Sequence, residues 1–232
     1  MTFGLLQCDH VDDHNRHLAG DYNDMFARWL PGDWRVYDLT AGVFPNPTEC
    51  DAWVSTGSHY SVYDDVPWIH QFTQLVRDID VAGVPFVGVC FGHQMMAHAL
   101  GGRVTRSPRG WGIGVHQFRV RAQEPWMEPP LDSVSLLMSC QDQVDQLPPE
   151  ATVLAFSDHC PVAIYRCRAM LGVQAHPEWQ PPYAAALLNE KNERIGEERI
   201  ASALCTLDTF RHSNELSEWA RNWIRLHAKI ES

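Results

Sequence analysis

The chain has 232 residues, 45% of them hydrophobic, and a formal net charge of −11 at pH 7. This length suits one large domain with a sizeable core or, at most, two small ones. The acidic charge argues against general binding to nucleic acid or to an anionic membrane surface, although a local arginine could still hold a small acidic ligand.

The N-terminus and the cysteines indicate a reduced, cytoplasmic setting. The opening MTFGLLQCDH has no basic region and no apolar run long enough for export. No stretch approaches the roughly 18 apolar residues that a membrane span needs. The seven cysteines are odd in number and form no CxxC pair, so neither a disulfide framework nor a structural zinc site is expected.

The first hundred residues alternate between strand and helix patterns. After a short strand, residues 10–21 are polar and predict a loop. Strands that alternate with helices imply βαβ units and a parallel sheet with helices on both faces. The predicted strands are residues 3–9, 34–40, 51–58 and 84–89, and the predicted helices are residues 22–30, 67–83 and 91–102.

The pattern changes after Gly102. Short strand-like segments separated by turns follow at residues 103–107, 113–122, 133–140, 152–157, 161–167 and 169–176. From about Pro181 the pattern is mostly helical, most clearly at 194–210 and 215–230. No linker rich in Pro, Gly or Ser divides the chain. We therefore predict a single α/β domain over residues 1–232, with a core over about 1–180 and a helical C-terminal segment over about 181–232.

The segment GVCFGHQ places Cys90 between Gly88 and Gly92, directly after an apolar strand. Ligands of open α/β sheets bind beyond the carboxyl ends of the strands, and a tight strand-to-helix turn there needs small neighbours. A thiol at a helix N-terminus is favoured as the thiolate. The pattern therefore predicts a nucleophile elbow. The alternative is a buried, inert cysteine, which is the commonest fate of this residue.

The segment LGVQAHPEW supplies a candidate base for this thiol. His176 follows an apolar run and stands two residues before Glu178. Pro177 favours an extended conformation, in which alternation sends both side chains to the same side. Glu178 could then fix the imidazole tautomer and leave the other nitrogen to deprotonate Cys90. The plainer interpretation is a strand-end histidine beside a solvated glutamate.

Together, GVCFGHQMMAHALGG and GVQAHPEW resemble the class I glutamine amidotransferase family in order and spacing, over roughly residues 1–180. The resemblance implies a single open, mostly parallel twisted sheet with flavodoxin-like layering. It implies that Cys90 attacks the γ-amide of glutamine or of a related γ-glutamyl compound and forms a γ-glutamyl thioester. His176 would act as base and then acid, and Glu178 would orient it. The implied mechanism needs no cofactor and no metal.

The resemblance also implies an oxyanion hole and one substrate contact. The backbone N–H groups of Gly57, in STGSHYS, and of Phe91 would stabilise the oxyanion. Gln94 matches a family position that helps to hold the glutamine substrate. Arg109 and Trp111 are expected to border the pocket.

The segment LLMSCQDQV resembles the family's Ser-His-x-Asp-x-Val segment, whose backbone contacts the amino-acid end of the substrate. Ser139, Cys140 and Gln141 are therefore expected to bind substrate. Cys140 replaces the usual histidine, which puts a side-chain contact from this position in doubt. We expect the Cys140 thiol to be unreactive.

Three functions stay open on the sequence. The first is an amidotransferase subunit that passes ammonia to a separate synthetase, since nothing after about residue 180 resembles an ATP-using domain. The second is a stand-alone γ-glutamyl hydrolase or peptidase. The third is a non-catalytic module, against which the intact Cys90, His176 and Glu178 argue.

Three further alternatives are disfavoured. A thiol α/β-hydrolase would place its acid before the histidine, and the deglycase and intracellular-protease group would tend to have histidine in place of Phe91. His10, His14 and His17 share one polar loop, for which solvation is expected rather than a metal site.

Overall fold

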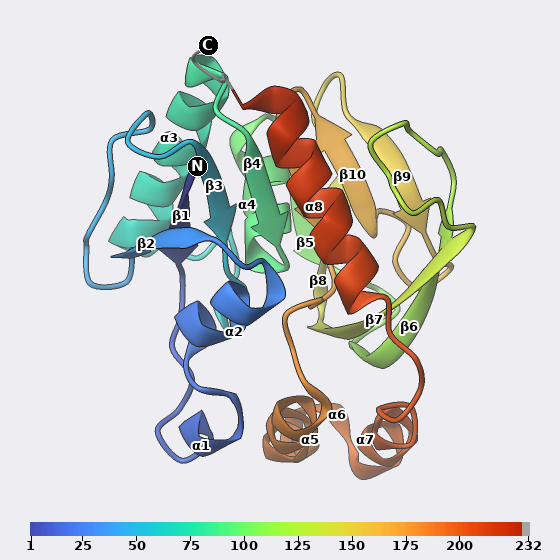
Figure 1. Cartoon of the computed structure of the whole chain (residues 1–232). Helices are drawn as coiled ribbons and strands as arrows, with labels where there is room; N and C mark the ends of the chain where they lie inside the picture. The colour runs from blue at the N-terminus through green and yellow to red at the C-terminus, as the bar shows by residue number, and fades with distance from the viewer. Residues whose placement is uncertain (229–232) are drawn as a thin grey trace.

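The structure, a computed structural model, describes residues 1–228 and is built around one large sheet with helices on both faces (Figure 1). The last two residues of the helix predicted over 215–230 lie outside the described residues. In chain order the elements are β1 (Thr2–Gln7), α1 (Arg16–Ala19), α2 (Tyr22–Trp29), β2 (Asp33–Asp38), β3 (Ala52–Ser55), α3 (Pro67–Ala82), β4 (Phe86–Val89), α4 (Phe91–Ala99), β5 (Arg103–Arg106), β6 (Gly112–Val120), β7 (Ser133–Cys140), β8 (Asp142–Gln146), β9 (Thr152–Phe156), β10 (Ile164–Cys167), β11 (Met170–Val173), α5 (Pro181–Glu190), α6 (Asn192–Ile195), α7 (Glu197–Leu204) and α8 (Ser213–His227).

The nine strands of the large sheet lie in the order β2-β1-β3-β4-β11-β10-β9-β6-β7. The strands from β2 to β11 are parallel, and those from β10 to β7 extend the sheet in antiparallel pairs. β5 and β8 form a separate antiparallel pair. The predicted α/β fold, with its open sheet and added short strands after residue 102, is confirmed.

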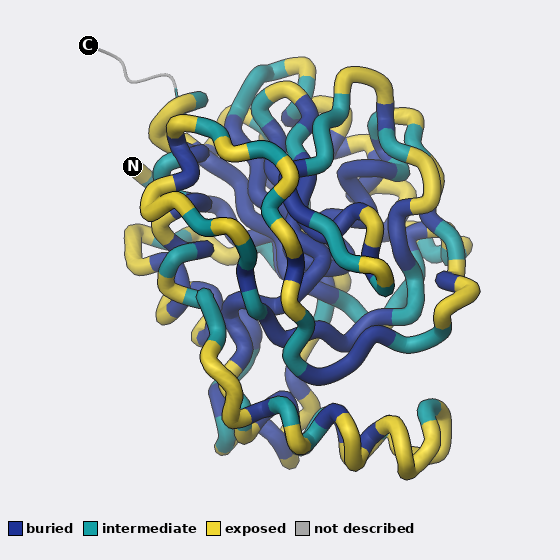
Figure 2. The backbone as a smooth tube through the Cα atoms, turned by 90° about the vertical axis from the view of Figure 1, so that its right-hand side faces the viewer, coloured by how far each residue is buried: buried dark blue, intermediate teal, exposed yellow. Residues whose placement is uncertain are grey.

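Alternation along the parallel strands fills a core on each face of the sheet. In β1, Phe3 and Leu5 pack on the face covered by α2 and α8, whereas Leu6 packs on the face covered by α3 and α4. β4 alternates in the same way. Figure 2 shows that buried backbone is concentrated in the centre of the molecule and that exposed residues gather in loops and on outer helix surfaces.

α8, in the predicted helical C-terminal segment, packs as part of the core. Its buried residues, Leu216, Trp219, Ala220, Trp223 and Ile224, recur at helical spacing and join the core on the α2 face. In Figure 1 this helix lies across the front of the sheet. The C-terminal segment therefore completes one of the two cores.

α5, α6 and α7 lie beyond the carboxyl ends of the parallel strands, at the bottom of Figure 1. Residues of α5 and α7 pack with α1, α2 and the antiparallel strands in a third core cluster that includes Met25, Ile113 and Tyr183. This position matters because ligands of open α/β sheets bind at the same edge.

Three predictions about individual elements are wrong. The helix expected over 194–210 is broken at Gly196, whose φ of +99° lies outside the helical range, and it ends at Leu204. The loop predicted over residues 10–21 contains a short helix, α1, over Arg16–Ala19. The last predicted strand ends at Val173 rather than at His176, because His176 makes only an isolated bridge to Leu137.

No helix within residues 1–228 combines the length and the apolar composition needed to cross a membrane.

Replacing Trp223 tests the role of α8. Trp223 is 1% exposed, and its indole N–H donates to the carbonyl of Ala169 at 3.1 Å. We expect Trp223→Ala to lower the free energy of unfolding by about 3–5 kcal/mol, measured by urea denaturation. Leu226→Ala on the same helix is the control, because Leu226 is 61% exposed, and it should cost less than about 0.5 kcal/mol. Equal losses in the two variants would contradict this account of α8.

Candidate active site

Cys90 occupies a strained turn between β4 and α4. Its φ of 51° lies in the left-handed region, which residues other than glycine rarely adopt. The Cys90 N–H donates to the carbonyl of Val173 at 2.9 Å, which anchors the turn to β11. The thiol is thereby held at the carboxyl end of the central parallel strands.

The glycines on either side of Cys90 are required by close packing. A Cβ atom on Gly88 would lie 2.5 Å from the backbone carbonyl carbon of Gly92, and a Cβ atom on Gly92 would collide with the Ser55 hydroxyl. The start of α4 therefore passes directly over β3 and β4. The Gly-x-Cys-x-Gly pattern follows from this approach of backbone to backbone.

His176 and Glu178 form a buried hydrogen-bonded pair. His176 Nδ1 donates to Glu178 Oε1 at 2.7 Å, and both residues are 3% exposed. The imidazole also stacks on the indole of Trp179, with 3.6 Å between ring centres and 11° between planes. Residues 177 and 178 form a turn, so the two side chains meet by chain reversal and not by the predicted strand alternation.

The charge environment of His176 differs from that of the other deeply buried histidine near the elbow, His93. Burial lowers the pKa of His93 to about 3, because no charged group compensates for lost hydration. Burial also acts to lower the pKa of His176, but the Glu178 carboxylate and the Cys90 thiolate overcome it and raise this pKa to about 9. His176 is therefore suited to hold a proton beside Cys90.

The two residues predicted to supply oxyanion donors lie beside this pair. Gly57 follows β3, and a Cβ atom there would be 2.8 Å from His176 Cε1 and 3.5 Å from Cys90 Cβ. Phe91 is the first residue of α4, where a backbone N–H has no intrahelical partner. Both N–H groups thus belong to backbone segments that adjoin the Cys90 thiol.

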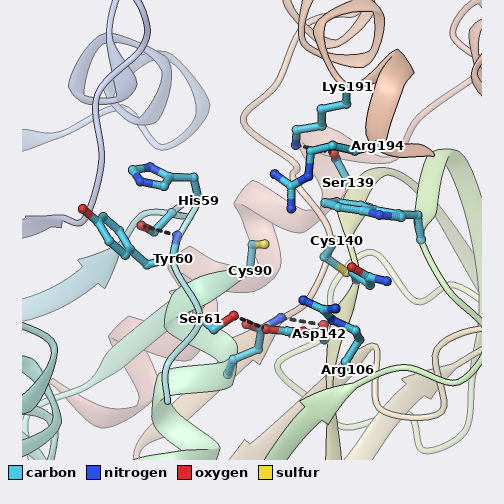
Figure 3. Close-up of a pocket in the computed structure, with 14 residues that line it drawn as sticks. His59, Tyr60, Ser61, Cys90, Arg106, Ser139, Cys140, Asp142, Lys191 and Arg194 are labelled. Atoms are coloured by element: carbon cyan, nitrogen blue, oxygen red, sulfur yellow. Dashed lines mark hydrogen bonds between the residues drawn. The ribbon is translucent and has the colours of Figure 1, made fainter. Parts of the chain in front are cut away.

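A pocket of about 100 Å³, which we call the Cys140 pocket, opens on one side of Cys90 (Figure 3). Its wall includes three basic side chains and one carboxylate side chain. Its lining consists of Ser58, His59, Tyr60, Ser61, Cys90, Gln94, Arg106, Trp111, Ser139, Cys140, Gln141, Asp142, Lys191 and Arg194.

A larger cavity of about 390 Å³, which we call the His176 chamber, opens on the side of His176. Cys90 lines both spaces. The wall of the chamber combines aromatic rings with acidic groups, and it consists of Asp9, His10, Asp12, Asn15, Tyr22, Ser58, His59, Cys90, Ser139, His176, Trp179, Tyr183, Leu187, Glu190 and Lys191.

All four residues predicted to bind substrate line the Cys140 pocket, where Ser139, Cys140 and Gln141 form its wall at the end of β7. The Gln94 amide donates to the carbonyl of Asp142 at 2.7 Å and to Gln174 Oε1 at 3.2 Å. Burial raises the pKa of the Cys140 thiol well above its usual range, which keeps this thiol neutral.

Of the two residues predicted to border the pocket, only Trp111 does so. Arg109 lies in an exposed turn and lines neither the Cys140 pocket nor the His176 chamber. The prediction for Arg109 is therefore wrong.

Sequence reasoning missed most of the wall that α5 and α6 contribute. Five residues line at least one of the two spaces, yet no motif marks them: Tyr183, Leu187, Glu190, Lys191 and Arg194. Gln174 was missed although a signal existed. It precedes His176 by two residues, and its side-chain nitrogen lies 3.8 Å from Cys90 Sγ.

One group within residues 1–228 has donor atoms spaced as a metal ion requires. Asp12, His14 and Glu190 bring one such atom each within 4.8 Å of one another. All three residues are exposed, and Glu190 Oε1 already accepts hydrogen bonds from His14 and Asn15. An exposed group of this kind is not by itself a metal site.

Comparison with known proteins matches residues 48–191 to the family model for glutamine amidotransferase class-I. Gamma-glutamyl peptidase 2 of Arabidopsis thaliana is 24% identical over 222 residues, which cover 90% of this chain and 89% of that protein. The glutamine-hydrolyzing GMP synthase of Thermomicrobium roseum is 32% identical over 219 residues, covering 79% of this chain but 40% of that protein. The crystal structure of a glutamine amidotransferase from Thermotoga maritima superposes with a TM-score of 0.73 at 20% identity, covering 96% of each chain.

The fit of the elbow against β3 can be tested with a double-mutant cycle. We expect Gly92→Ala to destabilise the fold by about 1–3 kcal/mol and to slow alkylation of Cys90 by iodoacetamide, because the new methyl group displaces the start of α4. Ser55→Gly removes the obstructing hydroxyl, which has no hydrogen-bond partner. The double variant should therefore recover most of both losses, and additive losses would contradict the steric explanation.

The raised pKa of His176 can be measured by NMR titration of its ring protons. We expect a midpoint near pH 9 and a lower midpoint in Glu178→Gln, because that variant loses the carboxylate charge. The unfolded value is near 6.5, so the stability that this group contributes is complete below pH 6.5 and is lost as the pH rises through about 9. His93, with a pKa of about 3, is the internal control and should not titrate in this range. A His176 midpoint that Glu178→Gln leaves unchanged would disprove the assigned cause.

Proposed function

The chain belongs to the class I glutamine amidotransferase family, and on that premise we propose that it is a stand-alone γ-glutamyl hydrolase with a Cys90–His176–Glu178 triad. The observation that carries the choice of substrate is the size of the His176 chamber, about 390 Å³, next to the nucleophile. The reaction is hydrolysis of a γ-glutamyl amide to glutamate and a free amine.

In the proposed mechanism the Cys90 thiolate attacks the γ-carbonyl carbon, and the carbonyl oxygen becomes an oxyanion held by the N–H groups of Gly57 and Phe91. The C–N bond breaks as protonated His176 gives its proton to the leaving amine, which leaves a γ-glutamyl thioester on Cys90. A water molecule then attacks the thioester carbonyl while His176 takes its proton. Breakage of the C–S bond releases glutamate and restores the thiolate.

Glu178 contributes by holding His176. Its hydrogen bond to Nδ1 directs the other ring nitrogen toward Cys90, and its charge stabilises the imidazolium that the first step consumes. The proposed reaction uses side chains and water alone. Its thiol chemistry and seven unpaired cysteines suit a cytoplasmic location, and we propose that residues 1–232 act as one domain.

The size of the leaving group distinguishes the two enzymatic hypotheses. Ammonia needs about the volume of one water molecule, roughly 30 Å³. The His176 chamber is far larger, and Trp179, Tyr183 and Leu187 give it an apolar surface that a larger amine could cover. The relative named gamma-glutamyl peptidase 2 also aligns over nearly its whole length, which supports the same choice.

The second candidate is a glutaminase that passes ammonia to a separate synthetase. It is favoured by the 32% identity to a glutamine-hydrolyzing GMP synthase, of which this chain spans 40%. In such a protein glutamine would be the preferred substrate, and a partner would raise its rate of hydrolysis.

A substrate comparison decides between the two candidates. We expect kcat/KM for γ-glutamyl dipeptides to exceed that for glutamine by about 10-fold or more, because only the dipeptides use the chamber. Glutamate release is the readout, and Cys90→Ala should reduce it to the background rate. Faster release from glutamine would support the ammonia-delivering alternative. Release that persists in Cys90→Ala would refute the proposed nucleophile.

Filling the chamber tests the observation on which the proposal depends. Leu187→Trp should lower kcat/KM for a γ-glutamyl dipeptide by about 10-fold while changing that for glutamine by less than about 3-fold, since ammonia still fits. Asn189→Trp is the matched control, because Asn189 is exposed on the same helix and lines neither space. A Leu187→Trp enzyme that hydrolyses both substrates equally well would show that the leaving group lies elsewhere.

A further inference from the structure

Lys191 stands out first by its residue type. The chain has 18 basic residues, and only Lys191 and Lys229 are lysines. Lys191 is thus the single lysine within residues 1–228, and it lies at the junction of α5 and α6, on the wall of both the Cys140 pocket and the His176 chamber. Where the other basic residues in this range are arginines, a compact ammonium group thus lies beside the proposed nucleophile.

Within residues 1–228, the ammonium group of Lys191 has no carboxylate partner. Among the described residues no acidic oxygen lies within 4.0 Å of Nζ. Nζ instead donates to the Ser139 hydroxyl at 3.0 Å and lies 5.3 Å from the centre of the Trp111 ring. Burial lowers the pKa of Lys191, and the positive charge of Arg194 acts in the same direction, although Cys90 and Glu190 partly oppose this shift.

The Cys140 pocket as a whole is suited to an anion. Lys191 and Arg194 enter it from one side and Arg106 from the opposite side, as Figure 3 shows, against a single carboxylate. That carboxylate, Asp142, accepts a hydrogen bond from the Ser61 hydroxyl at 2.5 Å. Of the three cations, Lys191 alone also lines the His176 chamber, so it is the one at the boundary that Cys90 shares.

The geometry of a γ-glutamyl group matches this arrangement. Its α-carboxyl carbon is four bonds of about 1.5 Å from the γ-carbonyl carbon, so the two are at most roughly 5 Å apart. With the carbonyl at Cys90 and the leaving amine in the His176 chamber, the α-carboxylate must lie in the adjoining Cys140 pocket. An ammonium group there can act as a point charge with donors that rotate to suit the anion.

We propose that Lys191 is the specificity-determining residue that binds the α-carboxylate of the γ-glutamyl group. This inference rests on the proposed function for the position of the substrate. It gives the C-terminal helical segment a direct part in recognition, because Lys191 selects glutamyl over otherwise identical acyl groups. A purely structural role, in which Lys191 fastens α5 and α6 to Ser139 and Trp111, makes a different prediction.

Two chromogenic substrates separate these roles. γ-Glutamyl-p-nitroanilide and 4-aminobutanoyl-p-nitroanilide have the same leaving amine and differ only in the α-carboxylate. We expect Lys191→Met to lower kcat/KM for the first by about 10- to 100-fold, mainly through KM, and to change that for the second by less than about 3-fold. Lys191→Arg should recover part of the loss. Arg225→Met, which removes an exposed charge on α8, controls for net charge and should leave both rates unchanged.

Equal losses for the two substrates would overturn the proposal in favour of the structural role. So would an unchanged KM for the γ-glutamyl substrate in Lys191→Met.

A binding measurement keeps the test independent of turnover. Calorimetry on Cys90→Ala protein should show that glutamate binds more tightly than 4-aminobutanoate and that Lys191→Met removes the difference. Should neither anilide be hydrolysed in a Cys90-dependent way, the proposed function fails, but a Lys191-dependent preference for glutamate would still support the carboxylate site. Failure of Cys90→Ala protein to prefer glutamate would refute it.

Discussion

The geometry of the candidate site depends on one backbone constraint, the turn at Cys90. The chain must leave β4 and enter α4 without a side chain on either flanking position, because α4 starts against β3 and its own preceding strand. Cys90 itself takes a left-handed φ of 51°. This strain is retained because packing around the turn leaves no alternative, and it holds the thiol at the edge where the five parallel strands end. Gly57, His176 and the wall at Ser139 are all arranged around that fixed point.

The site is assembled from parts that are distant in sequence. Loops after β1 and β3 form one wall, the ends of β7 and β11 form another, and α5 and α6 close the remaining side. The parallel strands place their carboxyl ends together, so residues 8–9, 56–57, 90 and 174–176 meet at one edge. The His176 chamber, with its aromatic wall, lies on one side of Cys90, and the cationic Cys140 pocket lies on the other. In our proposal the leaving amine occupies the chamber and the glutamyl group occupies the pocket.

Much of the fold and the centre of the site could be predicted from sequence because both are encoded locally. The apolar run before Gly88, the glycines around Cys90 and the His-Pro-Glu segment each carry a short-range physical requirement.

The wall that α5 and α6 form carries no such local requirement in its sequence. Tyr183 and Leu187 are ordinary residues of an amphipathic helix, and only the tertiary placement of that helix turns them toward Cys90. Arg109 failed as a prediction for the same reason, since the direction of an exposed turn depends on its neighbours. The contact between His176 and Glu178 was expected from strand alternation, whereas Pro177 and Glu178 make a turn that achieves it differently.

The order of strands has a consequence for the chain during its synthesis. β4 carries the thiol, yet its neighbour β11 is made about eighty residues later, and the His176 that faces the thiol follows β11 directly. A ribosome adding about 5–20 residues per second needs at least several seconds to cover that interval. Throughout it, Cys90 has neither its histidine nor the backbone anchor at Val173. In our proposal, therefore, Cys90 can act as a nucleophile only after β11 has joined the sheet and His176 lies beside the thiol.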